Sequence, residues 1–148
     1  MFTRSKSALV VVSAPVILTS VVWAQLPKKP TMESTVFDWS QVKAEAAKYG
    51  AKRQIFDGST ATMERLECHA TTLNPGETTH APRRQPDEEL VIVKEGTIEV
   101  QLNDQPRRVE AGSLIFVAAN DLYGVRNPTD VAATYYVVKW STAGSAAK

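Results

Sequence analysis

The residues best suited to acid–base or metal chemistry fall within one short stretch of the chain. It contains the only two histidines, His69 and His80, and three successive carboxylates, Asp87, Glu88 and Glu89. Imidazole nitrogens and carboxylate oxygens bind divalent transition metals, and imidazole also transfers protons near neutral pH. Asp87 and Glu88 occupy a turn that leads into an expected strand, where solvated carboxylates are ordinary.

Strand geometry predicts which side chains lie beside His69. Successive side chains of an extended strand point to opposite faces, so Glu67, His69 and Thr71 share one face. Cys68 lies on the other face between apolar neighbours, and we expect it to be a small core residue. It is the only cysteine, so an intramolecular disulfide is excluded.

The composition indicates one globular domain. The 148 residues are 43% hydrophobic and 22% charged, which is typical of a single folded domain rather than a disordered chain. The 17 basic side chains are balanced by 16 acidic ones, so no strong net charge favours a polyanionic partner. We therefore expect no nucleic-acid partner.

Residues 1–24 have the pattern of a secretory signal peptide. Arg4 and Lys6 precede an uncharged run from Ala8 to Trp23, and Ala24 is the expected last residue removed. The run is shorter than the roughly 20 apolar residues that a spanning helix needs, and polar residues interrupt it. Cleavage is thus favoured over an uncleaved membrane anchor, with no stable membrane span afterwards. The protein is expected to be periplasmic or secreted.

One short helix is expected near the start of the mature chain, after a flexible N-terminal segment over residues 25–35. The run from Trp39 to Tyr49 is rich in helix formers, with Ser40 as a possible cap and Gly50 beyond its end. The segment and the helix precede a part of the chain that is rich in expected strands.

From Arg53 onward, short β-rich runs alternate with turn residues. Gly96 tolerates positive φ, and Asn103 can form an Asx turn. Many short strands are typical of a sandwich or a closed barrel, so the sequence predicts an all-β fold. The expected strands are Arg53–Phe56, Thr62–Leu73, Glu89–Lys94, Thr97–Leu102, Arg107–Val109, Ser113–Val117, Tyr123–Arg126 and Ala133–Trp140.

Two spaced motifs resemble those of the cupin superfamily. The first runs from Pro75 to Gly96, with Glu89 followed by six residues and the closing Gly96. The second begins at Gly112 and continues with Ala118, Asn120, Tyr123 and Asn127. The resemblance implies a double-stranded β-helix, or jelly roll, with a pocket inside one end and often a homodimer. It places a single cupin domain at residues 36–148, with the barrel core at about 64–140.

The resemblance also implies a metal site of three histidines and one glutamate, and this chain keeps only the carboxylate, Glu89. Arg83 and Gln85 occupy the histidine positions if three residues precede Glu89, and Pro82 and Arg84 occupy them if four do. A guanidinium keeps its proton and repels a cation. We therefore expect no metal cofactor, with iron, manganese, nickel or zinc as the alternative.

Tyr123 occupies the third histidine position, where a phenolate could bind ferric iron. A displaced metal site of His69, His80 and Glu89 is a further alternative, if the face that carries His69 points into the barrel. In the simpler interpretation, His69 is a pocket-wall or surface residue and His80 belongs to a loop.

The candidate ligand-binding residues are Arg83, Arg84, Gln85, Glu89 and Tyr123. An arginine could pair with Glu89 and Tyr123 in a purely structural network. Alternatively, it could project into the mouth and recognise a carboxylate, phosphate or sugar, with Gln85 and Tyr123 fixing its orientation.

Three functions follow. The first, which is favoured over an enzyme, is an exported cupin that binds a small polar or anionic ligand without a metal, or an inactive relative that merely keeps the scaffold. The second is a metal-dependent dioxygenase, isomerase or decarboxylase that uses Glu89 with displaced histidines. The third is a structural or partner-binding module.

Overall fold

The computed structural model describes residues 30–142 of the chain. The expected signal peptide and residues 25–29 of the expected flexible segment lie outside this range. From residue 30 onward, the described part of that segment runs beside β2 (Gly50–Gly58), where Thr31 forms a parallel bridge with Ser59. In this part of the chain, no helix is long and apolar enough to cross a membrane.

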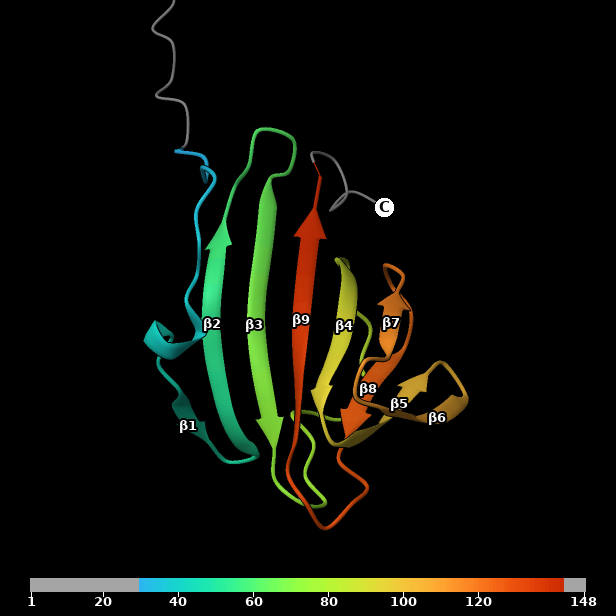
Figure 1. The fold of residues 1–148 in the computed structure, drawn as a ribbon. Helices are drawn as coiled ribbons and strands as arrows, with labels where there is room; N and C mark the ends of the chain where they lie inside the picture. Colours follow the sequence, from blue (N-terminus) through green and yellow to red (C-terminus); the bar gives the residue numbers. More distant parts are fainter. Residues whose placement is uncertain (1–29, 143–148) are drawn as a thin grey trace, which may run out of the picture.

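Two antiparallel sheets make up the body (Figure 1). The larger sheet has six strands in the order β1-β2-β3-β9-β4-β7, and the smaller has three in the order β6-β5-β8. The remaining strands are β1 (Glu45–Ala47), β3 (Arg65–Leu73), β4 (Glu88–Glu95), β5 (Thr97–Leu102), β6 (Gln105–Glu110), β7 (Leu114–Val117), β8 (Tyr123–Arg126) and β9 (Ala133–Ser141).

The order of the strands brings distant parts of the sequence together. The C-terminal strand β9 lies between β3 and β4, with Val137 opposite His69 on one side and Val91 on the other. Alternate side chains of both sheets point inward and form one apolar cluster, which includes Leu73, Val91 and Ile98. The predicted all-β jelly roll is confirmed, and eight of its strands overlap the expected runs.

The helix expected from Trp39 to Tyr49 is wrong. Only a single 3-10 turn forms, η1 (Trp39–Gln41), and Asp38 rather than Ser40 caps it, accepting a hydrogen bond from the Ser40 amide at 2.8 Å. The following residues form β1, which pairs with β2. Pairing at the edge of the sheet overrides the helix propensity of the alanines, because propensity differences amount to only a few tenths of a kcal/mol per residue.

Gly50 serves this β1–β2 hairpin instead of ending a helix. Its φ is +138°, a conformation that side chains disfavour, and a Cβ at this position would lie 2.3 Å from the carbonyl oxygen of Thr72. Close approach of β2 to β3 therefore requires glycine here.

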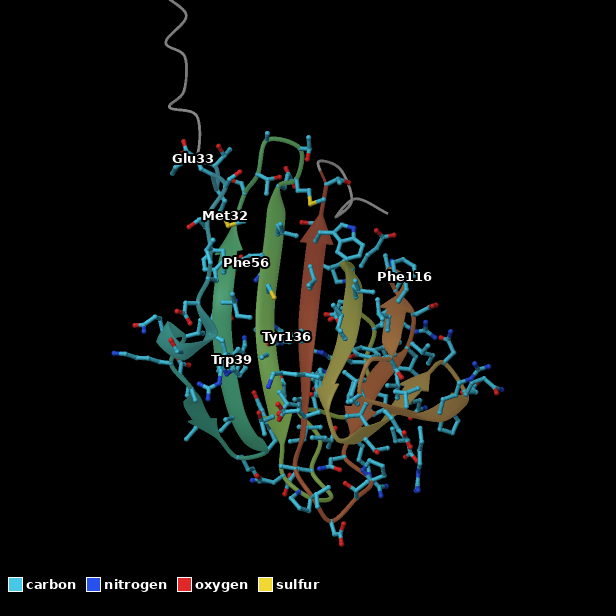
Figure 2. All side chains as sticks on the ribbon, viewed as in Figure 1. Met32, Glu33, Trp39, Phe56, Phe116 and Tyr136 are labelled. Atoms are coloured by element: carbon cyan, nitrogen blue, oxygen red, sulfur yellow. The ribbon has the colours of Figure 1, made fainter. Side chains whose placement is uncertain are left out.

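The outer face of the larger sheet carries its own aromatic layer. Figure 2 shows Trp39 over the sheet near Tyr136, and the two ring centroids lie 5.7 Å apart in an edge-on arrangement. Tyr135 instead points inward and is 2% exposed. Neighbouring aromatic residues of this strand therefore face opposite ways. The predicted homodimer stays a prediction.

Cys68 is buried, as predicted. Its side chain belongs to the face of β3 opposite that of the charged residues, and burial raises the pKa of its thiol to about 11, with the negative charge of Glu67 adding to the effect. The thiol is therefore a packing group.

Asn127 joins two connections of the chain, the one between β3 and β4 and the one between β8 and β9. Its side chain is fully buried, and Nδ2 donates hydrogen bonds to the carbonyl oxygens of Leu73, Asn74 and Val131 at 3.1, 3.2 and 2.7 Å. Oδ1 accepts from the amide and the hydroxyl of Thr129. This last residue of the second motif thus has a structural role.

Candidate functional site

A cavity of about 410 Å³ opens between the two sheets, and polar side chains from β3, β4, β8 and β9 line it. Its size falls in the range of small-molecule sites. Four cationic side chains, Lys52, Arg65, Arg83 and Lys139, and two carboxylates, Glu67 and Glu89, contribute to the lining. The cavity therefore carries a surplus of positive charge.

Strand register places three of these charged residues in one row across the sheet. Lys139 of β9 lies opposite Glu67 of β3 on one side and opposite Glu89 of β4 on the other. Since directly opposed residues of neighbouring strands point to the same face, all three reach the cavity. The central lysine separates two carboxylates.

Lys139 forms a close ion pair with Glu89. Nζ lies 2.6 Å from Oε1 of Glu89, whose side chain is 4% exposed, and 3.3 Å from Oε1 of Gln85. The amide nitrogen Nε2 of Gln85 is buried and has no hydrogen-bond partner in the described chain. The partner of Glu89 is thus a lysine of the C-terminal strand, whereas the sequence had suggested Arg83 or Arg84.

The second carboxylate, Glu67, has several partners. Its oxygens lie 3.0 Å from Nδ1 of His69, 2.9 Å from Nη2 of Arg65 and 3.8 Å from Nζ of Lys52, and one accepts from the Gln54 amide. Burial by itself raises the pKa of Glu67, but the charges and hydrogen bonds of these neighbours outweigh it and hold the pKa below its ordinary value. Glu67 is therefore ionised, and its neighbours hold its carboxylate in place.

Two buried tyrosines line the cavity. Burial raises the pKa of Tyr123 well above its ordinary value, and the neighbouring Tyr135 and Glu89 add to the effect. Burial likewise raises the pKa of Tyr135. Both phenols therefore keep their protons at neutral pH.

Arg83 and Arg84 point to different surroundings. The backbone of Arg83 pairs with that of Tyr123 through two hydrogen bonds of 3.0 Å, and its side chain lines the cavity. Both side chains are exposed, but Arg84 lies outside the cavity lining and donates to the carbonyl oxygen of Asn120 at 2.6 Å. The structure therefore brings Arg83, Gln85, Glu89 and Tyr123 together and leaves Arg84 apart.

Arg83 differs from the other cavity cations because its guanidinium makes no hydrogen bond or ion pair within residues 30–142. Arg65 is held by Asp57 and Glu67, and Lys139 is held by Glu89. A guanidinium that has no protein partner and lines a cavity with surplus positive charge is suited to bind an anion.

The cavity does not fit the metal site that the resemblance implies. Of the family's ligand positions only Glu89 carries a metal-binding group, and the Lys139 ammonium is paired with it. His69 and His80 both line the cavity, but Nδ1 of His69 faces Glu67 and Nδ1 of His80 lies 2.8 Å from the carbonyl oxygen of Ala81. Within residues 30–142, no group of three or more His, Cys, Asp or Glu side chains is arranged to hold a metal ion.

The sequence reasoning missed Lys139 and Lys52. Alternation along β9 was the available signal for Lys139, because Tyr135 and Val137 point inward and the next residue on that face is Lys139. Lys52 could not have been found in this way, since its strand was expected to begin only at Arg53.

A two-sheeted jelly roll with a polar cavity between its sheets defines the class: a small β-barrel protein with an internal site. The family model described as "Cupin domain" matches residues 69–139. The chain belongs to the cupin superfamily.

Solved structures share the fold across most of this chain. An RmlC-like cupin from Shewanella frigidimarina is 16% identical, with a TM-score of 0.61, over 74% of this chain and 93% of its own. The polyketide cyclase RemF from Streptomyces resistomycificus is 23% identical, with a TM-score of 0.61, over 74% and 80%. A cupin-superfamily sugar phosphate isomerase from Silicibacter pomeroyi is 17% identical, with a TM-score of 0.59, over 73% and 76%. Curated protein sequences give no significant match.

Proposed function

We propose that the protein binds a small organic anion in its cavity without a metal. The observation that carries this proposal is the guanidinium of Arg83, which lines a cavity with surplus positive charge and has no partner in the described chain. A carboxylate or phosphate would satisfy it through two parallel hydrogen bonds. This function favours a metal-free site over the metal-dependent dioxygenase, isomerase or decarboxylase alternatives.

The remaining lining suits a ligand with one charged end. Val125 and Val137 supply apolar wall, and the protonated phenols of Tyr123 and Tyr135 supply polar groups beside it. Small-molecule sites commonly combine such apolar walls with a few orienting polar groups. A sugar acid or a small oxo acid has this combination of one anionic end and a polar body.

Arg83→Gln is expected to weaken anion binding at least tenfold. The substitution removes a charge-assisted hydrogen bond, which contributes more than the roughly 1.4 kcal/mol that corresponds to a tenfold change in affinity. Titration calorimetry would compare glucuronate with glucose and oxamate with oxamide, so that each anion has a neutral counterpart of similar shape. The wild type is expected to bind the anions and to bind the neutral partners at least tenfold more weakly.

Arg84→Gln is the matched control. It removes the same charge one residue away, from a side chain outside the cavity. Equal losses of anion affinity in both variants would mean that the anion responds only to the overall positive charge of the protein and not to a contact with Arg83. If the wild type bound neither anion, or did not distinguish anion from neutral counterpart, the proposed function would fail.

We further propose that no metal takes part. The Lys139 ammonium beside Glu89 and the arginine at a family histidine position support this, because both repel a cation. Purified protein without an affinity tag, incubated with iron, manganese, nickel or zinc and then dialysed, is expected to hold far less than one metal ion per chain by elemental mass spectrometry. Stoichiometric metal that disappears in Glu89→Ala would contradict this proposal.

The site is proposed to operate outside the cytoplasm. The charged and apolar pattern of residues 1–24 supports export and cleavage. Expressed in a Gram-negative host, the full chain is expected to appear in the periplasmic or culture fraction with the intact mass of a chain that begins at Gln25. Recovery of the uncleaved chain in the membrane fraction would instead support an anchor.

A further inference from the structure

We propose that His69 is a general base that takes a proton from a carbon atom of the bound anion, with Glu67 as its positioning residue. The substrate class is a small carboxylate or phosphate ester that has a C–H bond next to a carbonyl group. The inference goes beyond binding and rests on the proposed function, because the anion must be held in the cavity for the base to reach it.

Geometry gives the imidazole of His69 one occupied and one open nitrogen. Nδ1 lies 3.0 Å from Oε1 of Glu67, whereas Nε2 makes no hydrogen bond within residues 30–142. Nε2 is not buried, because the described chain has only one buried side-chain nitrogen or oxygen without a partner, Nε2 of Gln85. The open nitrogen of His69 therefore has access to the cavity that its ring lines. An imidazole nitrogen that is open toward a cavity can accept a proton from a molecule there.

The surroundings of Glu67 determine which nitrogen carries the proton. Arg65, Lys52 and the Gln54 amide all hold this carboxylate in its ionised form, in which it can only accept hydrogen bonds. Nδ1 of His69 must therefore be the donor. The neutral ring then has its lone pair on Nε2, the nitrogen open to the cavity.

Charge around the ring keeps it in the neutral form that a base requires. Burial lowers the pKa of His69, and the positive charges of Lys52 on β2 and Lys139 on β9 act in the same direction. Glu67 opposes them through its charge and its hydrogen bond. His69 is therefore uncharged at pH 7 but can still be stabilised by Glu67 once it has gained a proton.

The proton transfer balances without a metal or any further reactant. The C–H proton of the substrate moves to Nε2, the C–H electron pair forms a C=C bond, and the carbonyl π pair moves to oxygen to give an enolate. The Arg83 guanidinium stabilises the anionic substrate. Return of a solvent-exchanged proton from Nε2 to carbon restores the carbonyl compound, so the net result is exchange of carbon-bound hydrogen with water.

The exchange is measured by proton NMR in D₂O with pyruvate, 2-oxoglutarate and dihydroxyacetone phosphate. The full mature protein is expected to exchange the protons next to the carbonyl of at least one of them ten times faster than free imidazole at the same concentration. His69→Gln keeps a donor for Glu67 but has no basic nitrogen, and it is expected to lose the exchange.

Glu67→Gln tests positioning rather than structure. Nitrogen-15 NMR of the wild-type imidazole is expected to show the proton on Nδ1, and the variant is expected to show a mixture of tautomers together with slower exchange. The wild-type exchange rate is expected to fall as the pH drops through the folded-state pKa of His69, which lies below 6.5.

Two results would overturn the inference: a wild-type proton on Nε2, or oxamate binding without faster exchange of any of the three compounds. Failure of every anion to bind would instead overturn the proposed function. The imidazole spectrum is recorded without ligand or mutation, so it distinguishes the two failures even where a variant does not fold.

Discussion

Replacing Asn127 by aspartate is expected to lower the free energy of unfolding by about 4 kcal/mol at neutral pH. The substitution preserves the size of the side chain and the acceptor for Thr129. It removes the NH₂ group that donates to the carbonyl oxygens of Leu73, Asn74 and Val131 and brings a carboxylate oxygen against all three. The second oxygen of a fully buried carboxylate would then face only acceptors.

Urea unfolding followed by circular dichroism measures this effect. Asn120→Asp is the matched control, because Asn120 is exposed, its side chain makes no hydrogen bond in the described chain, and aspartate tolerates its φ of 66°. The control is expected to change stability by less than about 0.5 kcal/mol. Equal stability of the Asn127 variant and the wild type would mean that the two connections do not depend on this amide.

Lys139→Met is expected to cost about 3 kcal/mol of stability, because it leaves the carboxylate of Glu89 buried without its ion-pair partner. The methionine preserves most of the apolar stem of the lysine. The loss of stability is therefore due to the missing charge rather than to poorer packing. In the described chain, the carboxylate of Glu89 has no other hydrogen bond or ion pair that would compensate.

A double variant separates the charge from the fold. Lys139→Met combined with Glu89→Gln removes both charges and is expected to recover to within about 1 kcal/mol of the wild type, since no charge is then left buried without a partner. Equal losses in the single and double variants would instead assign the effect to the lysine stem. Urea unfolding at pH 7 again provides the measurement.

Most of the fold could be predicted from the sequence because strands follow local patterns. Period-2 alternation and turn residues such as Gly96 and Asn103, both of which have positive φ, identified Thr97–Leu102 and Tyr123–Arg126 with their observed bounds. The failure came at β1, where alanines with high helix propensity pair with β2 at the edge of a sheet. A local pattern does not contain that contact.

The site was predicted only in part. Motif spacing singled out Arg83, Gln85, Glu89 and Tyr123, and all four line the cavity. It could not distinguish Arg83 from Arg84, whose side chains turn to different surroundings, nor name Lys139 as the partner of Glu89. That ion pair joins strands separated by 50 positions along the chain, and no local pattern encodes it.

The sequence by itself determined which chemical groups are present: a single carboxylate at the family's ligand positions, an arginine in place of a histidine, and alternating strands to carry them. Tertiary structure decided how those groups are paired. Strand order β3-β9-β4 put Lys139 between Glu67 and Glu89, joined His69 to an ionised carboxylate, and left Arg83 without a partner. The reason is physical: strand propensity depends on neighbours along the chain, whereas burial, ion pairing and proton position depend on neighbours across the sheet.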